Sequence, residues 1–319
     1  MKKHQINIKE HIWEVIVNPN AFSGKSIHLW NNISAQLKNA EIPYSEHFAN
    51  QANEGKILAQ HLCKNGKRHF IIIGGDGTLN EVVNGIYTAA VNRNEVYIVP
   101  FPVGTGNDWA HTHQYPNDFH LLFHHFQKGE FVSHDVGVVN TLQDNKIVDS
   151  RYFINIAGFC FDAEVIHETT KGKSRILASA TYILKLLKVL FRYKSKSLTL
   201  KWKEHVLQKE IFTIAVGICK YNGNGMMQVP MANPFDRLFD VVVIEKISIP
   251  KVIANVGNLF SGKHLRLKEV TVFQTDKLTI NATPYVMGEV EGEMLVTGDY
   301  TVQIDADSLN VLQCSENVI

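Results

Sequence analysis

The sequence predicts two domains: an α/β domain built on a parallel sheet with helices on both faces, followed by an all-β sandwich. Up to residue 134, short apolar strands alternate with helical patterns, which is typical of βαβ units. After Asp135, strand-like segments dominate, and several alternate apolar with polar residues. The length of 319 residues also fits two domains of roughly 150 residues each. We therefore expect domain limits of 1–134 and 135–305.

In the first domain, the predicted elements follow one another in strand–helix order. The segment FIII at 70–73 is apolar without interruption, which indicates a strand buried on both faces of a parallel sheet. The strands are expected at 13–17, 44–48, 70–73 and 96–100, and the helices at 26–40, 54–64 and 79–87.

The second domain is expected to be an antiparallel sandwich with two helical excursions. The helix at 250–262 opens at Pro250 and closes near Gly262, which is a common arrangement at helix ends. The other helix is expected at 174–193. The strands are expected at 152–157, 197–203, 211–218, 241–244, 270–273, 277–281 and 300–304.

The composition argues against several classes of function. With 32 basic and 31 acidic residues the net charge is +1, so no global basic field would bind nucleic acid. No apolar run reaches the ~20 residues needed to span a bilayer, and the start MKKHQINIKEH lacks the apolar core of a signal peptide. The four cysteines form no CxxC pair, which favours a reducing compartment and therefore the cytoplasm.

A glycine-rich turn follows the apolar strand at 70–73. Gly74, Gly75, Asp76, Gly77 and Thr78 lead directly into a helical pattern. Glycines let the backbone approach a ligand closely, and the start of a helix offers unpaired N–H groups to an anion. The turn matches neither GxxxxGK[ST] nor GxGxxG, so it is neither a Walker loop nor a Rossmann fingerprint. It predicts a phosphate site, although Asp76 could also simply cap the helix.

Two further turns repeat this logic after neighbouring strands. PVGTGNDWA contains Gly104, Gly106, Asn107 and Asp108, and NPNAFSG contains Asn18. Parallel strands present their carboxyl ends at one edge, where α/β folds bind ligands. Three such turns predict a polyphosphate site, although Asn107 and Asp108 could also cap a helix. Because a carboxylate repels phosphate, Asp76 suggests a bridging Mg²⁺ or a contact to a sugar hydroxyl.

These motifs resemble those of the diacylglycerol kinase and sphingosine kinase family, particularly its stand-alone bacterial lipid kinases. GGDGT alone is shared with NAD kinases, but GTGND and a late acidic–Gly–Glu triplet make the likeness specific. The resemblance implies that ATP and a lipid acceptor meet between an α/β domain and a β-sandwich, and that the tail 306–319 returns to the first domain. The likeness runs from NP…SG through GGDGTLNEVVNG, PVGTGNDWA, DVGVVN, FINIAGFCFDAEV and VPMANPFDRLFDVVVI to VEGEML.

The turns and the resemblance together assign roles to individual residues. Glu293 is expected to be the catalytic carboxylate that accepts a proton from the acceptor hydroxyl, with Asp76 as the rival base. By pattern alone, Glu293 would be an exposed hairpin glutamate, and only the resemblance favours the catalytic role. The expected nucleotide-binding residues are Asn18, Gly75, Asp76, Gly77, Thr78, Leu79, Asn80, Glu81, Gly104, Thr105, Asn107 and Asp108.

By resemblance, Asp236 with Asn233 and Leu238 would hold a structural magnesium ion. Two departures bear on the metal contacts. Arg237 stands where the family usually has glycine, and the late triplet is Glu291-Gly292-Glu293 rather than Asp-Gly-Glu. The first could distort or neutralise the structural site, and the second could shift a magnesium–water network.

The expected function is ATP- and Mg²⁺-dependent phosphorylation of a hydroxyl on a diacylglycerol-like lipid, presented at the inner face of the membrane. Asp162 in FDAEV matches an acidic contact of the sphingosine kinase pattern. The helix at 174–193 could lie on an anionic bilayer through its basic face, or be a core helix with a solvated edge. A NAD kinase-like enzyme, a non-catalytic nucleotide-binding regulator and a homodimer stay open.

The 15 histidines do not predict a metal site. His120 and His124 are four residues apart on an expected helix, which is a spacing that can bind metal. No nearby cysteine or acidic pair completes a ligand set, so no functional metal is expected from this pair.

Overall fold

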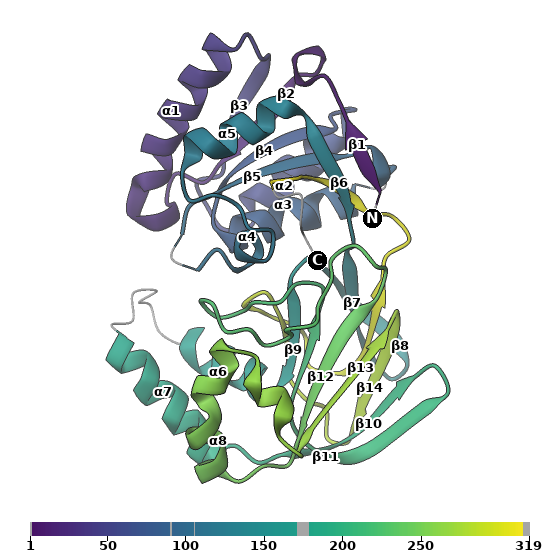
Figure 1. Ribbon diagram of the computed structural model, residues 1–319. Coiled ribbons are helices and arrows are strands. Elements are labelled where there is room, and N and C mark those ends of the chain that lie inside the picture. Colours follow the sequence, from purple (N-terminus) through teal and green to yellow (C-terminus); the bar gives the residue numbers. More distant parts are fainter. Residues whose placement is uncertain (1, 90, 105, 171–178, 315–319) are drawn as a thin grey trace.

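The computed structural model describes residues 2–89, 91–104, 106–170 and 179–314. They form two domains joined end to end, the α/β domain above and the β-rich domain below in Figure 1. One apolar cluster contains residues of both domains, from Trp13 in the first to Tyr300 in the second. The joint between the domains is therefore packed, and the predicted fold class is confirmed.

A seven-stranded sheet forms the centre of the first domain. β2, β3, β4 and β5 are parallel, and β18 joins them in parallel beside β5. At one edge, β6 is antiparallel to β18, and β1 is antiparallel to β6. The sheet is therefore mixed rather than wholly parallel. In sheet order the strands are β1 (Lys3–Gln5), β6 (Glu130–His134), β18 (Leu309–Leu312), β5 (Tyr97–Pro102), β4 (His69–Gly74), β2 (Trp13–Val17) and β3 (Tyr44–Phe48).

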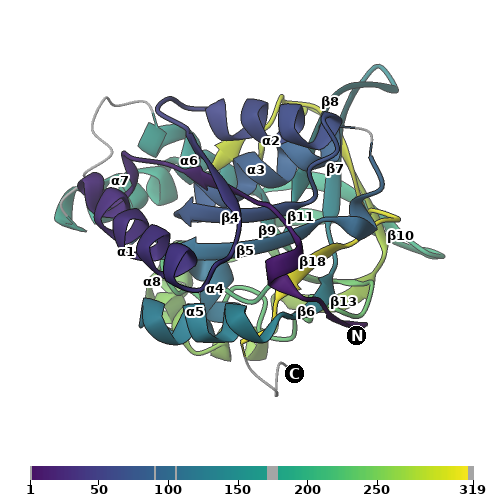
Figure 2. The ribbon, with the colours of Figure 1, turned by 90° about the horizontal axis from the view of Figure 1, so that it is seen from above.

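Helices cover both faces of this sheet. α2 (Glu54–Lys64) and α3 (Asp76–Thr88) pack together on one face, whereas α1 (Lys25–Asn39) and α5 (Phe119–Lys128) lie on the other (Figure 2). The short α4 (Asp108–Thr112) follows the second glycine turn. Short 3₁₀ turns at Ile8–Glu10, Ala21–Gly24 and Arg93–Glu95 complete the domain.

The ends of α5 show why the chain is helical there. Asp118 accepts hydrogen bonds from the backbone of His120 and Leu121, and Gly129 closes the helix with a φ of 68°. The His120 ring contacts Gln36 of α1 at 2.8 Å. His120 therefore links two helices on the sheet surface.

The second domain is antiparallel. β11 is long enough to pair with β10 through its first half and with β9 and β12 through its second. Its strands are β7 (Gly137–Gln143), β8 (Lys146–Phe153), β9 (Ile156–Cys160), β10 (Lys196–Trp202), β11 (His205–Gly217), β12 (Phe239–Glu245), β13 (Val270–Thr275), β14 (Lys277–Ala282), β15 (Gly288–Val290), β16 (Glu293–Met294) and β17 (Asp299–Ile304).

Helical segments flank this second sheet. α6 (Phe161–Thr170) directly follows β9, a helix that the sequence analysis did not predict. α7 (Ser179–Arg192) covers most of the helix expected at 174–193, whose first residues lie outside the described part of the chain. The helix expected at 250–262 is split into α8 (Ile249–Asn255) and 3₁₀ turns at Val256–Phe260 and Lys263–Arg266.

The strand expected at 152–157 is wrong as a single element. β8 ends at Phe153 and β9 begins at Ile156. Between them, the backbone N–H groups of Ile154 and Asn155 donate to the carboxylate of Glu291, both at 2.7 Å. At this corner, the side chain of a residue distant in sequence therefore accepts the backbone hydrogen bonds that a neighbouring strand would otherwise accept.

The chain crosses between the domains twice. β6 ends at His134 and β7 begins at Gly137. After β17, the chain returns and β18 inserts between β5 and β6 of the first sheet. The end of the described chain is thus a strand of the first domain.

Candidate active site

The first two glycine turns lie side by side at the carboxyl ends of β4 and β5. Val103 donates its backbone N–H to the carbonyl of Gly74 at 2.8 Å. The N–H of Asp108 donates to a carboxylate oxygen of Asp76 at 3.1 Å. The turn at residues 74–78 and the turn at residues 103–108 therefore form one continuous surface.

The third turn joins the same surface through Asn18. Its backbone N–H donates to the carbonyl of Ile73 at 3.0 Å, and its side-chain amide donates to the hydroxyl of Thr78 at 2.9 Å. The ends of β2, β4 and β5 are thereby tied together. This is the edge of an α/β sheet at which ligands usually bind.

Glycine occupies these positions of the turns for different physical reasons. A Cβ on Gly74 would overlap the Cβ of Thr78, so packing requires glycine there, whereas one on Gly104 would meet only the end of the Asn107 side chain, with Oδ1 at 2.7 Å. A Cβ on Gly77 would meet nothing within 4 Å, because this residue is exposed at the start of α3. The N-cap residue Gly75 has no side chain to cap the helix. The start of α3 is therefore open to an anion.

Three of the expected nucleotide-binding residues direct their side chains elsewhere. The Leu79 side chain is in the core. Asn80 is buried and donates to Glu291 at 2.7 Å. The Glu81 carboxylate accepts from the backbone of Asn53 and Gly55, at the start of α2. Thr105 lies outside the described residues.

Asp108 connects the turns to the second domain. Its carboxylate is 5% exposed and accepts hydrogen bonds from the backbone of Asn224 at 2.9 Å and of Gly225 at 2.7 Å. Gly106 lies against the same segment, because a Cβ there would be 2.6 Å from the Asn224 side chain. Asp108 thus fixes the second glycine turn against the other domain.

Opposite the turns, Glu291 lies between the two domains. Its carboxylate accepts from Asn80 of α3 as well as from Ile154 and Asn155 at the corner between β8 and β9. Burial raises the pKa of Glu291 to about 7, and the negative charge of Asp76 adds to this rise. Burial likewise raises the pKa of Asp76. Two carboxylates from opposite domains therefore lie close enough to influence each other.

Two further acidic residues of the second domain, Asp162 and Glu289, also have raised pKa values. Burial raises the pKa of Asp162 to about 7 and that of Glu289 to about 8, where the charge of Asp162 contributes further. Glu289 is 1% exposed and accepts from the backbone of Gly292 at 2.7 Å. Gly158 is required between them, because a Cβ there would overlap the Glu289 carboxylate.

Glu293 differs from the other acidic residues of its hairpin. It lies in β16, and its side chain is exposed. Within the described part of the chain, its carboxylate makes no hydrogen bond. Glu293 is therefore accessible to a reacting group.

The residues expected to hold a structural magnesium ion form a tight turn before β12. Asp236 accepts from the backbone of Leu238 at 3.0 Å, and Asn233 accepts from that of Phe235 at 3.2 Å. Arg237 has a φ of 67°, which explains why glycine would suit this position. Its guanidinium contacts Asp135 at 3.3 Å rather than Asp236, so the Asp236 carboxylate is not neutralised by its neighbour.

The residues of the turns fit ATP with Mg²⁺. The open start of α3 suits phosphate oxygens. Nearby, Oδ1 of Asn107 is buried and has no hydrogen-bond partner in the described chain. An acceptor oxygen suits a sugar hydroxyl or metal-bound water rather than phosphate. Asp76 supplies the hard oxygen that Mg²⁺ prefers.

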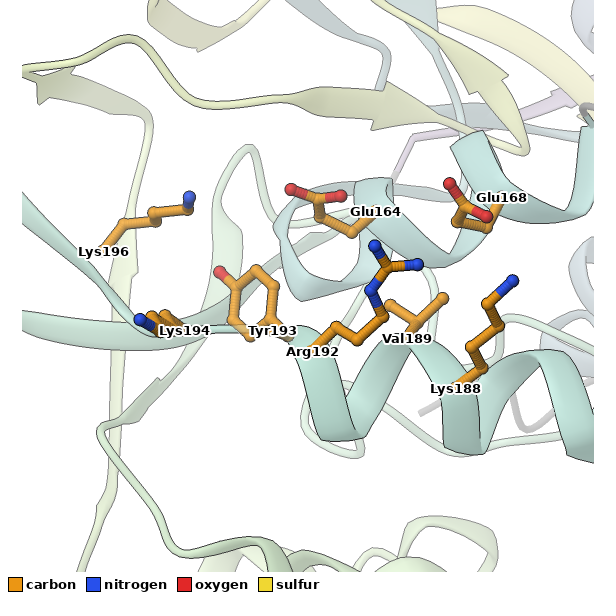
Figure 3. A pocket seen from close by; sticks show the side chains of 8 residues that line it. All are labelled: Glu164, Glu168, Lys188, Val189, Arg192, Tyr193, Lys194 and Lys196. Atoms are coloured by element: carbon orange, nitrogen blue, oxygen red, sulfur yellow. The ribbon is translucent and has the colours of Figure 1, made fainter.

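A polar groove of about 330 Å³ lies between α6 and α7, away from the glycine turns. In Figure 3, Glu164 and Glu168 project from α6 while Arg192 and Lys188 project from α7. Its lining residues are Glu164, Glu168, Lys188, Val189, Arg192, Tyr193, Lys194 and Lys196.

Comparisons with known proteins agree with this geometry. The family described as "Diacylglycerol kinase catalytic domain" matches residues 13–139, which contain all three turns. The family described as "YegS C-terminal NAD kinase beta sandwich-like domain" matches residues 155–313. The chain belongs to the diacylglycerol kinase family. It is a lipid kinase, and the resemblance drawn from its motifs is confirmed.

Relatives of this lipid kinase match along almost its full length. Diacylglycerol kinase of Staphylococcus carnosus (strain TM300) is 26% identical over 302 residues, covering 94% of this chain and 92% of that protein. A diacylglycerol kinase structure from Bacillus anthracis str. Sterne has a TM-score of 0.71 at 15% identity, covering 97% of this chain and 98% of that one. Yeast NADH kinase complexed with NADH has a TM-score of 0.53 at 11% identity, covering 97% and 84%. Both structures share the fold.

Sequence reasoning missed two features of this lipid kinase. Glu289 was not expected to be buried, and Glu291 was not expected to accept hydrogen bonds from Asn80, Ile154 and Asn155, although EVEGE at 289–293 places three glutamates within five residues. These surroundings depend on distant strands, so no local signal could reveal them. No helix in the described ranges is long and apolar enough to cross a membrane.

Proposed function

We propose that this lipid kinase transfers the γ-phosphate of ATP to a hydroxyl of a diacylglycerol-like lipid, in a Mg²⁺-dependent reaction. The observation that carries this proposal is the continuous surface of the glycine turns, with Asp76 near enough to Glu291 of the other domain for its charge to raise the Glu291 pKa. Residues 1–134, with the tail 306–319, would bind the nucleotide, and residues 135–305 would bind the acceptor.

Each domain has a separate task in this proposal. The backbone at Gly75 and Gly77 would hold the phosphates, and Asn18 would hold the first turn in place through Thr78. Magnesium would neutralise negative charge on the phosphates when bound. Asp236, Asn233 and Leu238 would hold a second, structural magnesium ion.

Glu293 is our choice for the group that accepts the proton of the lipid hydroxyl. Its carboxylate is exposed and unpaired within the described residues, whereas Asp76 already accepts a hydrogen bond from Asp108. A base must have an oxygen within hydrogen-bond reach of the hydroxyl, so an unpaired carboxylate suits the role better. Asp76 is the alternative base.

The lipid would approach through the second domain. Asp162, with its raised pKa, would contact the polar end of the lipid. On α7, Lys188 and Arg192 reach the groove while Phe191 is 63% exposed. Cations beside an exposed aromatic ring suit the surface of an anionic bilayer, at the inner face of the membrane.

The test is to incubate the protein with labelled ATP, Mg²⁺ and a total lipid extract, and to identify the labelled product by mass spectrometry. A parallel incubation replaces the lipids with NAD. We expect a phosphorylated glycerolipid and no labelled NADP. Labelled NADP without any labelled lipid would favour a NAD kinase-like enzyme.

The Glu293→Gln variant should lose the lipid product in the same assay. Binding of Mg·ATP to this variant and to the wild type is measured in parallel by calorimetry. Heat of binding without any labelled product from the wild-type protein would instead point to a nucleotide-binding regulator.

A further inference from the structure

Three metal-ligating side chains meet in the interior, where the two domains join. His113 follows α4, His134 ends β6, and Cys219 follows β11. Nε2 of His113 lies 3.1 Å from Nε2 of His134, and Sγ of Cys219 lies 3.9 and 3.8 Å from these two atoms. The three residues are at most 3% exposed. Two of them come from the first domain and one from the second.

The triangle of donor atoms has the size of a zinc site. Zinc binds imidazole nitrogen at about 2.0–2.1 Å and thiolate sulfur at about 2.3 Å in tetrahedral geometry. A tetrahedron with these bond lengths separates two nitrogens by about 3.3 Å and a nitrogen from sulfur by about 3.6 Å. The observed separations of 3.1, 3.8 and 3.9 Å are close to these values.

The surroundings orient His134 as a ligand. Its Nδ1 contacts the carbonyl of Asp135, so Nδ1 carries the proton and Nε2 carries the lone pair. A carbonyl that fixes the second nitrogen in this way is the usual support of a metal-bound histidine. Burial also favours the neutral imidazole, which is the form that binds metal.

Two of the three donor atoms also make other hydrogen bonds. Nε1 of Trp109 donates to Nε2 of His134 at 3.2 Å, and Nε2 of His113 lies 3.1 Å from the same atom. The thiol of Cys219 donates to the carbonyl of Ile154 at 3.2 Å. A cation between His113, His134 and Cys219 would replace the Trp109 bond and the thiol proton, and would use the lone pairs of both rings and the sulfur together.

We propose that His113, His134 and Cys219 form a structural zinc site that fastens the two domains together. A thiolate with two imidazoles is a soft donor set that suits zinc rather than magnesium. Three protein ligands leave the fourth position to a water molecule. This site shares no residue with the expected magnesium contacts, although Phe235 of that turn packs against His113 and His134. It does not depend on the identity of the lipid.

The site is tested with protein purified without a histidine tag, stripped by a chelator under reducing conditions and then titrated with Co²⁺. We expect one equivalent to produce a thiolate-to-cobalt charge-transfer absorption band. The Cys219→Ser variant should lose this band, whereas Cys63→Ser should keep it, because Cys63 is a buried cysteine of α2 outside this cluster. Surface histidines bind metal through nitrogen alone and give no such band.

The second measurement is the melting temperature in the presence of Zn²⁺. One equivalent of Zn²⁺ should raise the melting temperature of the stripped wild type and of Cys63→Ser, and leave that of Cys219→Ser unchanged. If Cys219→Ser does not fold, X-ray absorption of the zinc-loaded wild type decides: one sulfur and two imidazoles support the site. The absence of the cobalt band in the wild type, its survival in Cys219→Ser, or zinc without a sulfur neighbour would overturn the proposal.

Discussion

The two sides of the proposed active site, one in each domain, are built in different ways. On the nucleotide side, neighbouring backbone groups make the surface: residues 74–78 and 103–108 meet through contacts such as Val103 to Gly74. On the acceptor side, the surface consists of side chains that are distant in sequence. There Glu291 accepts from Asn80, Ile154 and Asn155, and Glu289 lies beside Asp162.

This difference suggests how the enzyme divides its work. A backbone surface offers fixed N–H groups to phosphates, which are the same in every ATP molecule. A surface of side chains can change with substitutions, and the acceptor is the part of the reaction that varies between lipid kinases. Substitutions on each side separate these two contributions.

The first prediction concerns Glu293, the exposed carboxylate of the acceptor side. Glu293→Gln should lower kcat at least ~100-fold, since this is the usual contribution of a general base. Affinity for Mg·ATP should stay nearly unchanged, because the nucleotide side is built by other residues. Both are measured with the lipid found in the extract assay, by initial rates and by calorimetry.

A matched control for this prediction is Glu204→Gln, which removes another exposed glutamate from a hairpin of the same domain. The control should keep the wild-type rate. Wild-type turnover by Glu293→Gln would remove Glu293 from the mechanism, and the same substitution at Asp76 would then be tested.

The second prediction uses the raised pKa of Glu289. Burial holds this pKa at about 8, against an ordinary value of 4.5. Between about pH 5 and pH 8 the folded state therefore binds more protons than the unfolded state, so the free energy of unfolding falls as the pH rises. The pKa values of Asp162 and Glu291 are raised in the same direction.

Glu289→Gln removes the charge and keeps an acceptor for Gly292. We expect the variant to be more stable than the wild type at about pH 8, by on the order of 2 kcal/mol, and to match it at about pH 5. Urea unfolding at the two pH values measures this. If the stabilities of the variant and the wild type fall in parallel, the burial of Glu289 has no such effect.

The nucleotide side could be predicted from the sequence because its determinants are local. Gly74 to Thr78 follow an uninterrupted apolar strand, and the parallel order of β4 and β5 then places the second turn beside the first. The helix expected at 54–64 is α2, because its apolar face, with Ala59, Leu62 and Cys63 buried, lies within those residues. Local propensity and periodicity are sufficient for such elements.

The acceptor side could not be predicted in the same way. The hydrogen bonds of the Glu291 carboxylate come from Asn80, which is 211 residues away, and from the corner between β8 and β9. That corner itself interrupts the expected strand at 152–157. The meeting of His113, His134 and Cys219 likewise requires both domains to be in place. Local sequence patterns do not reveal contacts between residues that are so far apart in the chain.

The third prediction isolates the backbone surface of the nucleotide side. A Cβ on Gly77 meets no protein atom within 4 Å, so Gly77→Ala should fold as well as the wild type or slightly better. A phosphate bound at the start of α3 would meet this methyl group. We expect Mg·ATP affinity to fall about tenfold, or about 1.4 kcal/mol, as measured by calorimetry.

Gly257→Ala is the matched control, because a Cβ there also meets nothing within 4 Å and lies outside the proposed site. It should bind Mg·ATP as the wild type does. Unchanged affinity in Gly77→Ala would mean that the phosphates do not approach this turn.

The fourth prediction has the smallest expected effect. It concerns the contacts of Arg237 with the segment that leads from β17 back to the first domain. The Arg237 guanidinium links the buried Asp135 carboxylate to the carbonyls of Asp305 and Ala306, yet Arg237 has a φ of 67°. Arg237→Ala loses these contacts and keeps the strained backbone, so we expect a loss of about 1 kcal/mol in the free energy of unfolding.

Arg237→Gly loses the same contacts but relieves the backbone, since a left-handed residue costs about 1 kcal/mol when it is not glycine. Its stability should therefore lie close to that of the wild type and above that of Arg237→Ala. Urea unfolding of the three proteins under one condition gives this order. Equal stability of the two variants would show that the left-handed backbone carries no cost here. Wild-type stability in both would mean that the guanidinium contacts contribute nothing, and that apolar packing alone holds this joint.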